Sequence, residues 1–166
     1  MCFSRDESKL YTAGDEAEIY EWDLRSTRKC LTRFSDEGAF STTALAVSNN
    51  SLATGSKMGS VNIYSLDTLG QEKPVKTLMN LTTQVTQLDF NHTGELLSFS
   101  SKWKKNAVKM AHLPSYTVYQ NYPGVAPGVL KYAFCGGFSY SSRYFGLGTD
   151  EGKCHMFELE HFAAKK

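Results

Sequence analysis

A residue pattern that returns roughly every 45 positions restricts the fold of this sequence more than any other feature. Each unit has an apolar residue followed by Ser or Asn, a turn, an apolar run that ends in small residues, a second turn, and another apolar run that ends in Leu. The four units extend over Phe3–Leu24, Val47–Leu66, Phe90–Leu113 and Phe138–Leu159. Self-similarity at this period, with three or four strands in each unit, is typical of the blades of a β-propeller.

The apolar runs are short and alternate with polar residues, which predicts strands, and a helical period is absent nearly everywhere. A further apolar run follows each of the first three units, at residues 29–35, 74–80 and 117–123, whereas none follows the fourth unit before the chain ends. We therefore predict an all-β fold of about four consecutive blades. The predicted blades cover residues 1–40, 41–82, 83–127 and 128–162, and residues 163–166 are a tail.

The end of the first unit resembles a WD repeat, because the stretch from Thr12 to Asp23 matches the family ending of that repeat without gaps. Two other units match it equally well, with Tyr64 and Phe157 at the position of Trp22. We expect structural roles for Trp22, Asp23, Tyr64 and Phe157, and we expect Trp22 to lie at the packed end of its blade.

The departures from the WD pattern also carry a prediction. Glu16, Met58 and Glu151 stand where the family has a turn aspartate, and no Gly-His pair opens any unit. The hydrogen-bond tetrad of WD blades should therefore be incomplete, and we expect hydrophobic packing to hold the blades together instead.

Four blades do not close a ring, because a WD40-type ring of seven blades needs roughly 300 residues at this period. An open arc exposes unpaired sheet edges, which are an aggregation hazard. We therefore expect this chain to be the C-terminal part of a seven-bladed WD40-type propeller.

The composition argues against several function classes. The formal net charge is +1, from 18 Lys and Arg against 17 Asp and Glu, so the chain as a whole has no general attraction for nucleic acid. The cysteines, Cys2, Cys30, Cys135 and Cys154, lack the spacing of zinc ligands. The acidic residues fall in the turns of separate units. We expect a protein that is not an enzyme, with no metal, no cofactor and no small-molecule substrate, and no contact with a membrane.

One cluster combines basic and aromatic side chains, namely Lys102, Trp103, Lys104, Lys105 and Lys109. Lysines could bind phosphates while the indole stacks on a base. The same cluster could instead contact a partner protein, or it could be a solvated turn whose Trp covers the edge of the blade. We expect the lysines of residues 102–105 to project together from a loop between two strands.

The stretch from Phe99 to Pro123 resembles the penultimate blade of the U3 small nucleolar RNA-associated protein 18 family, and the flanking units are similar to the neighbouring blades of that family. The resemblance covers residues 1–162. It implies a WD-repeat subunit of the UTP-B subcomplex in the small-subunit processome, located in the nucleolus of the nucleus.

The resemblance further implies a non-catalytic scaffold in ribosome biogenesis that acts in pre-18S rRNA processing. Its partners would be the other WD-repeat and helical-repeat subunits of UTP-B, the pre-rRNA and the U3 ribonucleoprotein. The alternative is a generic WD40 adaptor for protein–protein interaction in a ubiquitin ligase or a signalling complex, because propellers host unrelated functions.

Overall fold

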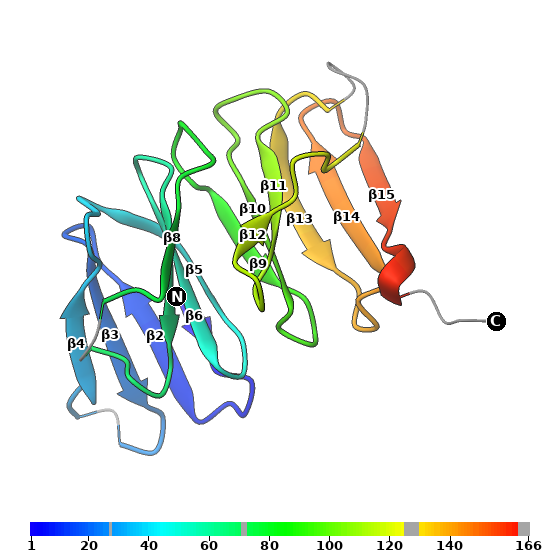
Figure 1. The fold of residues 1–166 in the computed structure, drawn as a ribbon. Coiled ribbons are helices and arrows are strands. Elements are labelled where there is room, and N and C mark those ends of the chain that lie inside the picture. The colour runs from blue at the N-terminus through cyan, green and yellow to red at the C-terminus, as the bar shows by residue number, and fades with distance from the viewer. Residues whose placement is uncertain (27, 71–72, 125–129, 163–166) are drawn as a thin grey trace.

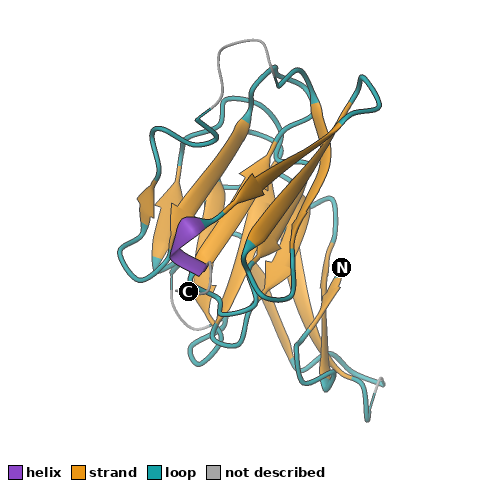
Figure 2. Cartoon of the chain, turned by 90° about the vertical axis from the view of Figure 1, so that its right-hand side faces the viewer, coloured by secondary structure: helices purple, strands orange, loops and turns teal. Residues whose placement is uncertain are grey.

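A computed structural model describes residues 1–26, 28–70, 73–124 and 130–162, and within these residues the chain forms four antiparallel β-sheets (Figure 1). The predicted tail at residues 163–166 lies outside the described residues. The only described helix is the short 3-10 turn η1 (Glu160–Phe162) after the last strand, so strands dominate the molecule (Figure 2). The all-β prediction is confirmed.

Each sheet is built from consecutive strands. Sheet 1 contains β1 (Cys2–Phe3), β2 (Lys9–Ala13), β3 (Glu18–Asp23) and β4 (Thr32–Ser35). Sheet 2 contains β5 (Thr42–Val47), β6 (Ser51–Ser56), β7 (Val61–Ser65) and β8 (Lys76–Leu78). Sheet 3 contains β9 (Gln87–Phe90), β10 (Leu96–Ser100), β11 (Val108–His112) and β12 (Thr117–Val118). Sheet 4 contains β13 (Ala133–Phe138), β14 (Tyr144–Thr149) and β15 (Cys154–Glu158).

The first strands of successive sheets lie side by side, which is the arrangement of innermost strands in a propeller (Figure 1). The Thr43 hydroxyl on β5 donates to the Val85 carbonyl just before β9, at 2.6 Å. The Asp89 carboxylate on β9 accepts the amide of Phe138 on β13, at 3.1 Å. The sheets form an arc and no closed ring is seen among the described residues, so the fold is that of a partial WD40-type propeller.

Three apolar clusters fill the three junctions between neighbouring sheets. Because successive side chains on a strand point to opposite faces, each sheet has one face toward the preceding sheet and one toward the following sheet. On the preceding face of every sheet, one residue of the second strand pairs with one of the third. These pairs are Leu10 with Trp22, Leu52 with Tyr64, Leu97 with Ala111, and Phe145 with Phe157.

Two sheet faces have no neighbour among the described residues. On sheet 1, Tyr11 points toward sheet 2, so Leu10 and Trp22 point away from it. On sheet 4, Phe145 points toward sheet 3, so Gly146 points away. Within the part of the chain that the structure describes, both ends of the arc are therefore open, and no fourth strand lies beside β15.

Candidate functional site

The basic loop (Lys102–Lys105) connects β10 and β11 at the end of the third sheet. β10 is buried along its whole length, and Ser101 continues that burial directly after it. The Ser101 amide donates to the Ala107 carbonyl at 2.9 Å, and its hydroxyl lies 2.8 Å from the Thr83 hydroxyl. Asn106 ends the loop in the left-handed region, with φ of 56°, which Asn tolerates better than most residues. The loop is thus anchored at both ends.

All four side chains of the basic loop are exposed. The three lysines project from a loop between two strands, as expected, whereas the exposure of Trp103 was left open by the sequence. The Lys102 ammonium lies 5.3 Å from the centroid of the Trp103 ring. The Lys104 ammonium donates to the Thr82 hydroxyl at 3.1 Å. The indole of Trp103 is 61% exposed, which leaves a free aromatic face beside several cations.

Lys109 does not join the basic loop. It lies on β11, paired with Phe99, and its half-buried side chain lines a groove between the outer strands of sheets 2 and 3. Lys76 and Thr117 line the same groove. The structure therefore divides the predicted cluster into a loop of four residues and a separate lysine on the flank of the sheet.

Sheet 4 adds basic residues beside the loop that the sequence reasoning did not select. The Asn106 amide donates to the Lys131 carbonyl at 3.0 Å, and Lys105 lies 5.8 Å from the Tyr132 ring centroid. Lys131 forms an ion pair with Glu151, and the Lys153 ammonium lies 3.0 Å from the same carboxylate. The sequence signal for this cluster was weak because Lys131 and Lys153 are isolated in the chain.

The Glu151 carboxylate is held in its ionised form at this position. Hydrogen bonds from Lys131 and then from Lys153 lower the pKa of Glu151 to about 2. Glu151 and the adjacent Asp150 together offset the charges of Lys131 and Lys153. The positive charge of this surface therefore comes from the lysines of the basic loop. Lysines and an exposed indole can bind phosphates and stack on a base, or they can dock onto an acidic protein surface.

The expected structural residues occupy different environments. Trp22 is half-buried, and its indole N–H donates to the Thr12 hydroxyl at 2.9 Å. Tyr64 is 3% exposed between sheets 1 and 2. Phe157 is partly buried against the cluster between sheets 3 and 4, with its ring centroid 5.9 Å from that of Tyr122. The Asp23 carboxylate accepts the Arg25 amide at 2.8 Å in the turn after β3.

Hydrophobic packing is not the only force between the blades, which corrects the prediction from the incomplete tetrad. The buried Asp36 carboxylate accepts hydrogen bonds from Thr42 at 2.9 Å, from the Asn62 amide at 2.7 Å and from the Tyr64 hydroxyl at 2.8 Å. This Asp36 network connects the segment after β4 to sheet 2. The sequence did not reveal it because two of the partners of Asp36, namely Asn62 and Tyr64, lie 26 and 28 residues further along the chain.

Other sites are sparse. All four cysteines are free thiols. Within the described ranges, no group of three or more His, Cys, Asp and Glu side chains is placed to hold a metal ion. In the same part of the chain, no helix is long and apolar enough to cross a membrane.

Known proteins resemble this chain over almost its whole length, although no protein-family model matches it. The U3 small nucleolar RNA-associated protein 18 homolog of Homo sapiens is 43% identical over 166 residues, which cover 97% of this chain. The homolog of Arabidopsis thaliana is 37% identical over 98% of the chain. U3 small nucleolar RNA-associated protein 18 of Saccharomyces cerevisiae is 29% identical over 92% of the chain.

The match covers only a part of each relative, since the chain spans 30% of the human and Arabidopsis proteins and 29% of the yeast protein. Within that part the similarity extends from human to yeast. The resemblance expected from residues 99–123 and their flanking units is confirmed. The chain belongs to the U3 small nucleolar RNA-associated protein 18 family.

Proposed function

We propose that this chain is part of a non-catalytic scaffold in ribosome biogenesis, which acts with the U3 ribonucleoprotein in pre-18S rRNA processing and small-subunit processome assembly. The observation that carries the proposal is the 43% identity to a protein whose name associates it with the U3 small nucleolar RNA. On this proposal the protein is located in the nucleolus and contacts other subunits of UTP-B. The open faces of sheets 1 and 4 would pack against further blades of the longer polypeptide.

The basic loop is the proposed RNA contact within this segment. A tryptophan that covered the edge of the blade would be buried, whereas Trp103 is 61% exposed. None of the three loop lysines forms an ion pair with an acidic side chain among the described residues. Cations that have no carboxylate partner in the protein can release counterions from a phosphate backbone when they bind it. These features favour RNA over a solvated turn.

The test uses the full-length protein with Lys102→Glu, Lys104→Glu and Lys105→Glu combined. Exposed changes away from caps and cores alter stability by about 0.5 kcal/mol or less, so the variant should fold. Affinity purification should recover less pre-rRNA and U3 RNA with the variant than with the parent. Ultraviolet cross-linking should place RNA adducts on residues 102–105 of the parent.

A matched control removes the same charge elsewhere, through Lys29→Glu, Lys73→Glu and Lys76→Glu. The control should recover RNA at the parental level. If cross-linking at the basic loop gives peptide adducts but no RNA adducts, the loop binds a partner protein and not RNA. Absence of U3 RNA and of other processome subunits from the parent purification would overturn the proposed scaffold function as a whole.

A further inference from the structure

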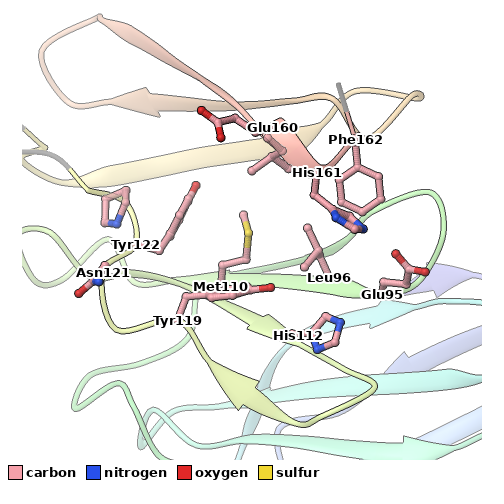
Figure 3. A pocket seen from close by; sticks show the side chains of 12 residues that line it. Glu95, Leu96, Met110, His112, Tyr119, Asn121, Tyr122, Glu160, His161 and Phe162 are labelled. Atoms are coloured by element: carbon pink, nitrogen blue, oxygen red, sulfur yellow. The ribbon is translucent and has the colours of Figure 1, made fainter. Parts of the chain in front are cut away.

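A second candidate surface lies at the opposite end of β11 from the basic loop. A groove of about 400 Å³ opens between sheet 3 and the η1 turn that follows sheet 4 (Figure 3). Apolar side chains from both sheets line it, and several point toward its centre in the close-up view. The apolar lining residues are Leu96, Met110, Tyr122, Leu159 and Phe162. The volume is in the range of ligand-binding clefts and admits one large apolar side chain.

The rim of this groove carries acidic groups. Glu95 lies just before β10, and Glu160 lies at the start of η1. Among the described residues neither carboxylate has a hydrogen bond or an ion pair, in contrast to Glu18, Glu21 and Glu151. No lysine or arginine is found among the described residues that line the groove. We call this surface, with its two glutamates, the acidic groove.

Two histidines, His112 and His161, also line the groove, and His112 is hydrogen-bonded to Ser115. Two carboxylates without a lysine or arginine partner above an apolar floor favour one kind of occupant. An apolar side chain would contact Met110 and Leu96, while flanking cations would lie near Glu95 and Glu160. The exposed Asn121 amide and Tyr119 hydroxyl on the same rim can bond to a peptide backbone. An RNA strand is disfavoured here because its phosphates would meet two negative charges.

We propose that the acidic groove binds a peptide segment of a partner protein in which an apolar side chain is flanked by lysine or arginine. The proposal goes beyond the scaffold function, because it assigns a protein contact to a surface separate from the basic loop. It holds whether or not the basic loop binds RNA.

The experiment follows the methyl group of Met110 by NMR in the full-length protein with 13C-methyl methionine, assigned through Met110→Leu, which nearly conserves volume. The probes are the acetylated heptapeptides Ser-Gly-Lys-Phe-Lys-Gly-Ser and Ser-Gly-Glu-Phe-Glu-Gly-Ser, with Ser-Gly-Lys-Gly-Lys-Gly-Ser as the control without an apolar side chain. Met58, which is exposed in the turn after β6, is the internal reference for an unaffected site.

The Lys-Phe-Lys peptide should shift the Met110 signal in a saturable manner and leave Met58 unchanged. The Glu-Phe-Glu peptide should bind at least about fivefold more weakly, as expected from the loss of two exposed charge pairs and the gain of repulsion. The double variant Glu95→Gln, Glu160→Gln should bind the Lys-Phe-Lys peptide about threefold more weakly, or less tightly still. Asp15→Asn with Glu16→Gln, which removes two charges in a distant turn, should have no effect.

Equal binding of the two Phe peptides would overturn the proposal, and so would an unchanged Met110 signal at about 1 mM peptide, the weak end of specific contacts. The second result would mean that the longer protein itself covers the groove. If the double glutamine variant loses its native spectrum, the single Glu160→Gln change in the exposed η1 turn gives the same comparison. Unchanged affinity in that variant would count against the proposal.

Discussion

The pair Leu52 and Tyr64 in sheet 2 and the pair Leu10 and Trp22 in sheet 1 occupy the same register position, and yet they lie in different environments. Leu52 and Tyr64 face sheet 1 and are 0% and 3% exposed. Leu10 and Trp22 face away from every described sheet and are only half-buried. Both pairs consist of large apolar or aromatic residues. Their difference in burial therefore comes from the presence or absence of a described preceding sheet.

The far end of the arc differs in a complementary way. The outer face of sheet 4 has Gly146 and Gly148 on its central strand, with the exposed Cys135, Cys154 and Met156 beside them. A face with glycines at its centre is shallow and accepts large side chains from a neighbour, whereas the outer face of sheet 1 presents large side chains. The two ends of the arc therefore have the properties of unfilled blade junctions rather than of finished surfaces.

The largest expected effect is that of Tyr64→Ala. This change empties a buried aromatic site between two sheets and removes a hydrogen bond to Asp36. It should lower the free energy of unfolding by about 3–5 kcal/mol, the range for emptying a large aromatic site in a core. Urea unfolding measures it, with Tyr140→Ala as the control, because Tyr140 is 83% exposed. A loss below about 1 kcal/mol would show that the junction between sheets 1 and 2 is not a packed core.

Asp36→Ala should be the next most harmful change, at about 2–3 kcal/mol. It removes the acceptor of the Thr42 and Tyr64 hydroxyls and one of the two acceptors of the Asn62 amide, which keeps its bond to the Glu37 carbonyl. Unsatisfied buried donors are costly. Denaturant unfolding of this variant, with Asp15→Ala in an exposed turn as its control, separates the network from simple charge removal. Equal stability of the two variants would contradict a stabilising role for the Asp36 network.

Trp22→Ala should destabilise this 166-residue chain by only about 1–2 kcal/mol, less than the Tyr64 change, because the indole is half-buried on an open face. In the full-length protein the same change should be more harmful, because a preceding sheet would bury the indole. Parallel unfolding measurements on the two proteins test this difference. The same loss in both would mean that no sheet packs on Trp22.

The smallest effect concerns Asp89, whose carboxylate links the innermost strands of sheets 3 and 4. Burial raises the pKa of Asp89 above its ordinary value, so the folded state binds a proton more readily than the unfolded state. Stability from this group is therefore present at low pH and is lost as the pH rises through the raised pKa. Between pH 4 and 7, the free energy of unfolding should decrease less steeply with rising pH in Asp89→Asn than in the parent. If the free energy of unfolding depends on pH with the same slope in both proteins, Asp89 does not contribute to the pH dependence of stability.

Much of the fold could be predicted from the sequence because propeller blades repeat. The unit starts at Phe3, Val47, Phe90 and Phe138 each coincide with the last residue of an innermost strand. The three strands that the structure describes in sheet 4 also agree with the apolar runs of the fourth unit. The partial exposure of Trp22 could not be predicted. A sequence pattern indicates which face of a strand a residue occupies, but it does not indicate whether a neighbouring sheet covers that face.

The candidate sites were predictable only where they are local. The basic loop is a run of consecutive residues between two strands, and the structure places those residues together. Lys109 is four residues further on but lies on a strand, where the sheet directs it elsewhere. The acidic groove combines Glu95 with Glu160, which the chain brings together only through the packing of sheets 3 and 4.

Alkylation of Cys135 and Cys154 in the full-length protein tests the central claim, that the open faces of this arc are blade junctions. Both thiols are exposed on the outer face of sheet 4. If a further sheet packs there, iodoacetamide should label them far more slowly in the native protein than in urea, as measured by mass spectrometry. Native labelling at the rate seen in urea would contradict the claim, because it would leave that face open in the complete protein.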